Sequence, residues 1–403
     1  MRILNVTQSY APFFEFGGPP VKVKALAEGM ARRGHEVTVL TADWGLEARL
    51  RASPDETQSE PSPFGRRRKV NGVTAVYLAN WWHYHATSWN PALGRYLRAR
   101  LKEFDIVHIF GLYDLFGPRV AKECRRRKLP YVVEPIGMFV PIVRNLWLKR
   151  IYHALWGREM LNRADAIIVT SEQERDEVLA GGSAEEKVVL RRNGVEVPAK
   201  MPERGRFRET LKIPVQDKLI LFLGRLSQKK SPDLLLRAFA GLGNAMIGGG
   251  PVPHLVFVGP DESGMKARLE QMATGLSVSD RVHFSPPLEG EAKWAAYRDA
   301  DIFVLPSQNE NFGNTAAEAV VAGTPVIVTE RCGIAPLLKD TAGLVVRHEE
   351  LELRNALARL LEHEDVYRRL QQGCATAIDK LGWDQPLEQM EYSYSRLARR
   401  TAS

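Results

Sequence analysis

Cysteine is scarce in this sequence, whose 403 residues include only Cys124, Cys332 and Cys374. The three lie far apart and form no metal-binding pattern, so we expect neither a structural zinc site nor a disulfide framework, and a reducing cytoplasm is favoured. Long apolar runs are also missing, because none approaches the ~20 residues that a membrane-spanning helix needs. The first residues, MRILNVTQSYAP, are typical of a strand and not of a signal peptide.

The excess of basic over acidic residues is confined to one half of the chain. Residues 1–200 hold 31 Lys and Arg against 22 Asp and Glu, a net charge of +9, whereas the remainder holds 25 against 26. Basic runs at residues 66–69 and 125–128 concentrate this excess. Such a face serves nucleic acid, anionic lipid or a phosphorylated substrate, or is simply solvated. Because the sequence has no zinc pattern and no single-strand-binding signature, we expect no nucleic-acid partner.

Short apolar strands alternate with amphipathic helices, the pattern of parallel sheets covered on both faces. The length, with 44% apolar and 26% charged residues, fits two globular domains. We therefore expect an α/β fold of two Rossmann-like, doubly wound parallel-sheet domains, residues 1–197 and 205–380, facing each other across a ligand cleft. The expected strands are 2–6, 36–41, 73–78, 105–110, 131–134 and 166–169 in the first domain, and 218–223, 255–258, 282–284, 302–305 and 325–328 in the second.

Two further segments complete this prediction. The last helix, about residues 385–403, has an apolar stripe at spacings of three and four and should pack back on the first domain. That stripe consists of Leu387, Met390, Tyr394 and Leu397. Residues 46–65 contain three prolines and three serines and are expected to form a mobile loop.

The segment FLGRLSQKKSPDLLLRAF, residues 222–239, places two cations just past the end of a strand. The strand should end at Gly224, with Arg225 and Lys230 on the loop before a helix that begins near Pro232. Cations at this position suit a phosphate in the crevice, because arginine grips oxygens in a fork while lysine acts as a point charge. Alone the signal is weak, since such residues commonly decorate a surface.

The segment ENFGNTAAEAVVAG, residues 310–323, has two glutamates around an expected helix start. Gly313 and Asn314 lie where short residues cap the first N–H groups, and seven residues separate Glu310 from Glu318. Helix N-termini bind anions, and a carboxylate suits the vicinal hydroxyls of a ribose. In isolation a helix cap and a solvated carboxylate would look the same. Beside Arg225, the segment predicts a site for a nucleoside-diphosphate sugar.

These motifs resemble the family-4 retaining glycosyltransferases of the GT-B fold, including bacterial enzymes of glycan and lipopolysaccharide synthesis. The resemblance covers nearly the whole chain, and its most specific element is the pair of glutamates seven residues apart (EX7E). It implies a nucleoside-diphosphate sugar as donor, a UDP-sugar first and a GDP- or ADP-sugar as alternatives, with retention of anomeric configuration and no metal ion. The matching segments are GRLSQKK, VGPDESG, ENFGNTAAEAVVAGTPVI, RRNGVE and GGPPVKVKALAEGMARRGHEVTVLTA.

The resemblance also implies roles for single residues at the donor. Arg225 and Lys230 would contact the diphosphate, and Glu318 would contact the ribose. Glu310 would hold the transferred sugar. Fixed cations beside the leaving diphosphate lower the barrier, so Arg225 and Lys230 are catalytic candidates. Glu310 is the third candidate, because its carboxylate would hold the transferred sugar.

Backbone groups complete the implied donor site. The backbone of Asn311, Phe312 and Gly313 would assist Glu310, with Asn314 next to it at the helix start. Gly17 and Gly18, in the loop after the first strand, would approach the diphosphate from the opposite domain. A side chain there would block close backbone approach.

The first domain departs from this family in one loop. Many relatives carry a histidine after the strand equivalent to residues 131–134, whereas this chain reads EPIGM, with Ile136 at that point. Glu134 or a backbone carbonyl is a candidate to take part there instead. His108 lies within an expected strand and is interpreted as a core histidine.

One Asp-x-Asp occurs, Asp299-Ala300-Asp301, and such a pair can hold a metal. It precedes the strand at residues 302–305, so it should lie at the amino end of the sheet, away from the crevice. We interpret it as a solvated turn.

The acceptor side is less closely specified. Aromatic residues, which can stack on sugars or meet lipid, cluster after a first-domain strand, although packing within the protein is the favoured interpretation. They are Trp81, Trp82, His83, Tyr84, His85 and Trp89.

Residues 144–161 interleave two tryptophans with four cations. This pattern is typical of an interfacial helix and also of a helix folded onto its own domain. The residues concerned are Trp147 and Trp156 with Arg144, Lys149, Arg150 and Arg158. Together with the +9 half, they favour a glycan or lipid-linked acceptor and peripheral contact with an anionic membrane, the inner face of the plasma membrane.

Three other functions remain open at this point. A nucleotide-sugar epimerase or a phosphorylase could use the same architecture. A catalytically silent nucleotide-sugar-binding subunit is suggested by the missing histidine. A nicotinamide-dependent oxidoreductase is disfavoured, because no Gly-x-Gly-x-x-Gly follows any expected strand.

Overall fold

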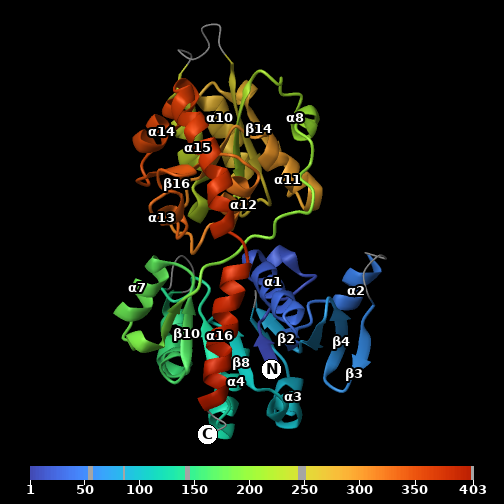
Figure 1. Ribbon diagram of the computed structural model, residues 1–403. Coiled ribbons are helices and arrows are strands. Elements are labelled where there is room, and N and C mark those ends of the chain that lie inside the picture. Colours follow the sequence, from blue (N-terminus) through green and yellow to red (C-terminus); the bar gives the residue numbers. More distant parts are fainter. Residues whose placement is uncertain (53–57, 85–86, 141–145, 244–250, 401–403) are drawn as a thin grey trace. The chain divides into compact units, whose positions relative to one another are not determined.

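Two parallel β-sheets flanked by helices organise the chain (Figure 1). The computed structural model describes all residues except 53–57, 85–86, 141–145, 244–250 and 401–403. The chain divides into an N-terminal unit, Met1–Asn193 with Trp383–Ser403, and a C-terminal unit, Gly194–Gly382. The expected α/β class with two parallel-sheet domains is confirmed.

The sheet of the N-terminal unit has the order β11-β10-β9-β8-β1-β2-β5-β4-β3. Its strands from β11 to β5 are parallel, and β4 and β3 add an antiparallel edge. Strand β1 lies between β2 and β8, so the chain order reverses beside β1. The strands are β1 (Arg2–Val6), β2 (Glu36–Ala42), β3 (Glu60–Ser62), β4 (Gly65–Val70), β5 (Val73–Leu78), β8 (Ile106–Phe110), β9 (Tyr131–Glu134), β10 (Ala166–Val169) and β11 (Val188–Leu190).

Helices flank this sheet, and a separate short hairpin consists of β6 (Trp82–Tyr84) and β7 (Thr87–Trp89). The main helices are α1 (Gly18–Arg32), α3 (Ala92–Arg100), α4 (Phe116–Arg127), α7 (Glu172–Ala180) and the segment α5 (Leu146–Tyr152), η3 (His153–Gly157) and α6 (Arg158–Asn162).

The final helix, α16 (Asp384–Arg400), packs on the N-terminal unit, as expected (Figure 1). All four residues of its apolar stripe are at most 4% exposed. The Tyr394 hydroxyl lies 2.6 Å from Nδ1 of His108 in β8. A Cβ added to Gly29 of α1 would lie 2.5 Å from Cδ2 of Leu387, so α1 and α16 approach closely at that glycine.

The sheet of the C-terminal unit has the order β14-β13-β12-β15-β16-β17, with every pair parallel. Because β12 pairs with β13 on one side and with β15 on the other, the chain order reverses between β12 and β15. Open α/β sheets bind ligands at such a switch point, at the carboxyl ends of the strands. The strands are β12 (Lys218–Leu223), β13 (Pro253–Val258), β14 (Val282–Ser285), β15 (Ile302–Leu305), β16 (Val326–Thr329) and β17 (Gly343–Val346).

Helices on both faces cover this second sheet. They are α8 (Arg206–Leu211), α9 (Pro232–Ala240), α10 (Met265–Gly275), α11 (Gly290–Asp299), α12 (Asn314–Val321), α13 (Ala335–Leu338), α14 (Glu350–Glu362) and α15 (Glu364–Ala377). None of the helices in the described part of the chain is long and apolar enough to cross a bilayer.

The prediction of a mobile loop over residues 46–65 is wrong for most of its described part. Helix α2 (Leu46–Arg51) begins there because Asp43 Oδ1 accepts the N–H groups of Gly45 and Leu46 at 2.9 and 2.8 Å. Leu46 and Leu50 are buried beneath it, and β3 follows at residues 60–62. Residues 53–57 lie outside the described residues.

The interpretation of Asp299-Ala300-Asp301 as a solvated turn is also wrong. Asp299 is 5% exposed, and its carboxylate accepts the N–H groups of Gly205, Phe207 and Arg208 at 2.6, 2.7 and 3.1 Å. Asp301 accepts the Arg208 guanidinium at 2.6 Å and the Leu219 N–H at 2.8 Å. The motif precedes β15, as expected, but it caps α8 and ties that helix to β12.

We expect Asp299→Ala to lower the free energy of unfolding of the C-terminal unit by about 2–4 kcal/mol, because two buried N–H groups and one partly buried N–H group at a helix start lose their acceptor. Urea unfolding followed by tryptophan fluorescence measures this change. Asp379→Ala, at an exposed position, is the control and should stay within about 0.5 kcal/mol of the parent protein. Equal costs for the two variants would contradict the capping role.

Candidate functional site

Two loops meet at the carboxyl edge of the C-terminal sheet, where β12 lies beside β15. One carries residues 224–231 and the other carries residues 306–313. The Gln308 N–H donates to the Lys229 carbonyl at 2.9 Å, and the side chains of Lys230 and Glu310 form an ion pair. Each of these two side chains is about one-fifth exposed, at 21% and 20%. The structure thus joins residues from two separate sequence motifs at one point.

A glycine contact sets the course of the first loop. A Cβ on Gly259, whose φ is +143°, would lie 2.0 Å from the Gly224 carbonyl oxygen. Beyond this contact, the Leu226 N–H donates to the Pro260 carbonyl at 2.9 Å. Arg225 projects between these fixed points, is exposed, and makes no ion pair with any described residue.

The second loop is held by the segment that follows β16. The Glu310 N–H donates to the Arg331 carbonyl at 3.0 Å, the Gly333 N–H donates to the Glu310 carbonyl at 2.9 Å, and the Ile334 N–H donates to the Phe312 carbonyl at 2.7 Å. The Phe312 ring is 2% exposed and packs in the core. Only the backbone of Phe312 is therefore available to a ligand.

Helix α12 starts at this loop on a glycine, which has no side chain of its own to cap the helix. Gly313 is the N-cap residue with φ +104°, and a Cβ there would lie 3.0 Å from Cγ2 of Ile334. Both facts favour glycine at this position. Asn311 and Asn314 are partly buried on either side of it. The N–H groups of a first helical turn lack intrahelical partners and form a ready anion site.

Glu318 lies just over one turn into α12, where α11 fixes its carboxylate. Lys293 Nζ donates to Oε1 at 2.8 Å and the Tyr297 hydroxyl donates to Oε2 at 2.7 Å. Burial, together with the Glu318 charge, raises the pKa of Tyr297 well above its usual value, so the hydroxyl keeps its proton and remains a donor. An ionised carboxylate has about four acceptor positions, so about two remain for a ligand.

Sequence reasoning missed Lys293 and Tyr297. Their spacing of four residues places them on one face of a helix. The sequence does not reveal which other element that face contacts.

Gly17 and Gly18 lie after β1, at the switch point of the N-terminal sheet. Gly17 has φ +92° and is the N-cap of α1, which begins at Gly18. The Gly17 N–H donates to the Phe14 carbonyl at 2.9 Å. Within its own unit, this glycine pair therefore stands at the start of a helix on the carboxyl edge of the sheet.

Comparison with known proteins decides the family. The model described as "Glycosyl transferase 4-like domain" matches residues 17–194, and that described as "Glycosyl transferases group 1" matches residues 203–375. A D-inositol 3-phosphate glycosyltransferase of Actinosynnema mirum is 31% identical over 399 residues, which cover 94% of this chain and 92% of that protein. The chain belongs to the group 1, family-4-like glycosyltransferases.

Solved structures of GT-B glycosyltransferases share the fold of this glycosyltransferase. Sucrose-phosphate synthase from Thermosynechococcus elongatus has a TM-score of 0.74 at 21% identity, with 100% of both chains covered. HepE of Anabaena, solved in complex with UDP-glucose, has a TM-score of 0.75 at 18% identity, covering 98% of this chain and 100% of that one. Several other D-inositol 3-phosphate glycosyltransferases match over only 51% to 59% of their own length.

The N-terminal unit of the glycosyltransferase contains a buried cluster of charges. The Glu134 carboxylate accepts Lys22 Nζ at 2.7 Å and Arg191 Nη2 at 2.6 Å, and all three side chains are at most 3% exposed. His108 Nε2 lies 3.4 Å from Glu134 Oε2. Burial alone would raise the pKa of Glu134, but Arg191 and Lys22 more than offset this and hold it well below its usual range.

This cluster settles the surroundings of two residues considered above. His108 is fully buried in β8, so its interpretation as a core histidine is confirmed. Burial lowers the pKa of His108. Glu134 has no exposed surface and serves as the counter-charge of Lys22 and Arg191.

Ile136, at the position where the family resemblance implies a histidine, adopts a left-handed backbone conformation with φ +57°. A β-branched residue seldom adopts it. Glu174 stabilises the loop, because its Oε1 accepts the Gly137 N–H while its Oε2 accepts the Thr170 N–H at 2.9 Å.

The expectation that the aromatic cluster packs within the protein is wrong for its tryptophans, which are exposed. Trp81, Trp82 and Trp89 are 84%, 57% and 40% exposed on and beside the β6–β7 hairpin. A two-stranded hairpin of this length cannot bury such large rings by itself. His83 does pack, edge-on to Trp44 with ring centroids 5.5 Å apart. His85 lies outside the described residues.

The segment from α5 to α6 buries only part of its apolar surface. Tyr152, Met160 and Leu161 are buried in its own unit. A row of large apolar side chains on the same segment stays 42% to 64% exposed: Leu146, Trp147, Leu148, Ile151, Leu155 and Trp156. Of the interleaved cations, Arg144 lies outside the described residues.

We expect Glu134→Gln to lower the free energy of unfolding at neutral pH by about 3–5 kcal/mol, because Lys22 and Arg191 stay buried without their counter-charge. The lowered pKa of Glu134 sets the pH window. Its contribution is fully present above its unfolded pKa of about 4.3, and is lost progressively as the pH falls from there toward the folded pKa.

Urea unfolding at neutral and acidic pH tests this dependence, and the difference between parent and variant should shrink on acidification. Glu159→Gln removes an exposed partner of Arg125 and should cost less than about 1 kcal/mol. A cost for Glu134→Gln no larger than that of the control would show that the buried pairing contributes nothing.

Proposed function

We propose that this glycosyltransferase moves a sugar from a nucleoside-diphosphate sugar, a UDP-sugar first, to a glycan or lipid-linked acceptor with retention of anomeric configuration. The observation that carries the proposal is the Lys230–Glu310 ion pair at the switch point between β12 and β15. A cation and a carboxylate therefore lie beside the start of α12. There the cation would bind a phosphate and the carboxylate would accept hydroxyl groups of the same ligand. The UDP-glucose bound by HepE supports the donor class.

Donor binding would exchange the partners of this ion pair. A diphosphate offers Lys230 stronger charge than one carboxylate, and Arg225, which is exposed, would grip the same oxygens as a fork. Glu310 is then released to accept hydroxyl groups of the transferred sugar. The backbone near Gly313 would contact the phosphate, and Gly17 and Gly18 remain candidates for a backbone contact with it.

The chemical step rests on charge that develops on the leaving diphosphate. As the sugar–phosphate bond breaks, negative charge grows on the oxygen that Arg225 and Lys230 would contact, so both cations bind the transition state better than the bound donor. Contacts of this kind are worth about 3 kcal/mol each in related sites. The ribose would meanwhile be held by Glu318, which Lys293 and Tyr297 orient.

Labelled donor distinguishes this proposal from the alternatives. With a UDP-sugar and a glycan acceptor, we expect a new glycoside whose anomeric proton coupling in NMR matches that of the donor. Isomerised donor would indicate an epimerase, and phosphate-dependent release would indicate a phosphorylase. If the donor is neither transferred nor slowly hydrolysed, the protein is a silent binding subunit. An inverted product would exclude retention.

We expect Glu318→Ala to weaken UDP binding about 100-fold, because two hydrogen bonds from ribose hydroxyls to a charged group are lost. Titration calorimetry measures this affinity. Tyr297→Phe, which removes one donor to Glu318 and keeps the ring, should show a smaller loss. Glu362→Ala, an exposed position on α14, is the control and should bind like the parent protein. Unchanged affinity in Glu318→Ala would refute the ribose role.

We also propose that the exposed row of α5–α6 rests on an anionic membrane, on its cytoplasmic side. Apolar side chains there alternate with Lys149, Arg150 and Arg158, the composition of an interfacial helix. The Trp81 and Trp82 side chains add further exposed aromatic surface. A lipid-linked acceptor would then be reached from the membrane surface.

We expect Leu155→Ser to weaken binding to phosphatidylglycerol vesicles about tenfold, since the burial of one leucine in the interface is lost. Leu351→Ser is a matched control, because Leu351 is 55% exposed in the C-terminal unit and Leu155 is 57% exposed. Sedimentation with vesicles at low salt measures both. If the parent protein fails to sediment, or both variants lose binding equally, the proposed membrane face is wrong.

A further inference from the structure

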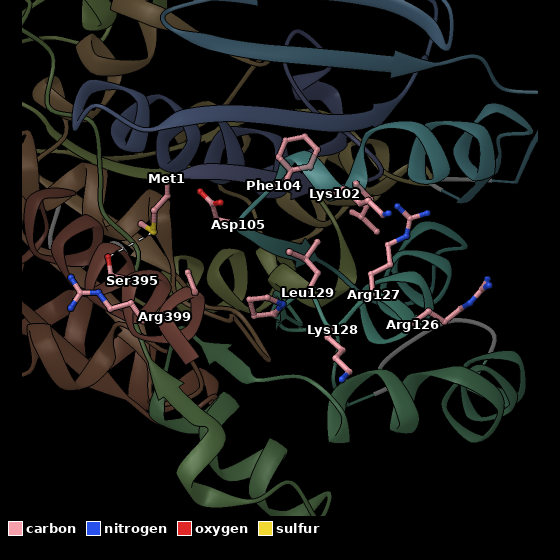
Figure 2. Close-up of a pocket in the computed structure, with 13 residues that line it drawn as sticks. Met1, Lys102, Phe104, Asp105, Arg126, Arg127, Lys128, Leu129, Ser395 and Arg399 are labelled. Carbon is pink, nitrogen blue, oxygen red and sulfur yellow. Dashed lines mark hydrogen bonds between the residues drawn. The ribbon is translucent and has the colours of Figure 1, made fainter. Parts of the chain in front are cut away.

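A cavity of about 880 Å³ opens at the amino edge of the N-terminal sheet (Figure 2). Residues directly before three parallel strands form part of its lining, namely Met1 before β1, Asp105 before β8 and Pro130 before β9. This edge is opposite the one that carries Gly17 and Gly18. The cavity is therefore separate from the donor site proposed above, and its size is typical of small-ligand sites.

The lining of this cavity is strongly basic. Five cationic side chains line it against one carboxylate, Asp105: Lys102, Arg126, Arg127, Lys128 and Arg399. Asp105 already accepts the Arg2 N–H at 2.7 Å. Figure 2 shows Lys102, Arg126 and Arg127 at one end of the cavity, and Met1, Ser395 and Arg399 at the other.

Local acidic residues neutralise only part of this charge. Glu123 pairs with both Arg126 and Arg127, at 3.2 and 2.8 Å. Within the described part of the chain, the side chains of Lys102, Lys128 and Arg399 make no ion pair. Cations held near one another without counter-charge repel, and an anion placed between them removes that repulsion.

An apolar floor distinguishes this cavity from a merely solvated basic face. Leu101 and Pro130 are buried, Phe104 is 9% exposed, and Leu129 is partly buried between the cations. The arrangement offers charge at the rim and apolar contact below it. A phosphate group with an attached organic body matches both parts, because the phosphate meets the cations while the body lies on Phe104 and Leu129.

We propose that this cavity is a second ligand site, which binds a phosphate-bearing molecule away from the donor. Two sources share that chemistry, a soluble phosphate ester and the headgroup of a phospholipid. The inference does not rest on the proposed function, since it uses only residues of the opposite sheet edge.

The test compares Lys102→Gln and Lys128→Gln, singly and combined, with the control Lys122→Gln, which removes one charge as each single variant does. Lys122 lies on α4, is exposed, and is not among the lining residues, so the control removes a nearby charge without touching the cavity. Calorimetric titration with inorganic pyrophosphate, in the presence of UDP, forms one arm. Sedimentation with phosphatidylglycerol vesicles, against vesicles of phosphatidylcholine alone, forms the other.

We expect the double variant to bind at least one probe about tenfold or more weakly than the parent protein. The Lys122→Gln control should bind both probes like the parent protein, and transferase activity should be unchanged in every variant. Weaker pyrophosphate binding identifies a soluble phosphate ligand, and loss of vesicle binding alone identifies a lipid headgroup. Equal binding of both probes by the double variant and the control overturns the proposal. Because the substituted side chains are exposed, circular dichroism should confirm an unchanged fold in every variant.

Discussion

The parallel pairing of β12 with β15 is the constraint on which the donor site depends. It aligns Ile220 with Ile302 and Leu221 with Phe303, so both strands end at the same edge. Lys230 and Glu310, 80 residues apart in sequence, meet only because of this pairing. A slip of one residue would turn the side chains of either strand to the opposite face of the sheet. The ion pair therefore depends first on the register of the two strands and only then on the conformation of the loops.

The N-terminal unit handles charge in a different way. Lys22, Glu134 and Arg191 come from a helix and the ends of two strands, and their side chains are buried from solvent. Such a cluster contributes little net stability compared with apolar packing, but it penalises any arrangement in which one partner moves away. The loop that contains Ile136 thus follows directly after a rigidly held strand end, although an isoleucine cannot perform imidazole chemistry.

The central strands could be predicted because buried parallel strands are nearly continuous apolar runs, as in KLILFL and IFVL. Several strands at the edges of the sheets could not be predicted in this way. β4 reads as the basic run RRRK, although Arg68 within it is buried while Arg67 is exposed. The hairpin around Trp82 is too short to show alternation.

At the site itself, the spacing of Glu310 and Glu318 predicted one residue on the loop and one in the helix, and the structure places them so. The partners of Glu318 were beyond prediction, because the packing of α11 against α12 is set by the sheet beneath them. The burial of Asp299 could not be predicted for the same reason. Its position before a strand followed from chain direction, but its burial depends on Phe207, 92 residues earlier.

Helix α16 sets the order in which the two units can complete their folding. Its residues follow the whole C-terminal unit in the chain, yet Leu387 fills the space above Gly29 and Tyr394 provides the hydrogen-bonding partner of His108. During synthesis, the ribosome must therefore release residues 194–382 before the N-terminal unit can complete its core. Until then His108, α1 and the neighbouring strands expose apolar surface that α16 will later cover. The second unit to be translated can be the first to reach its final structure.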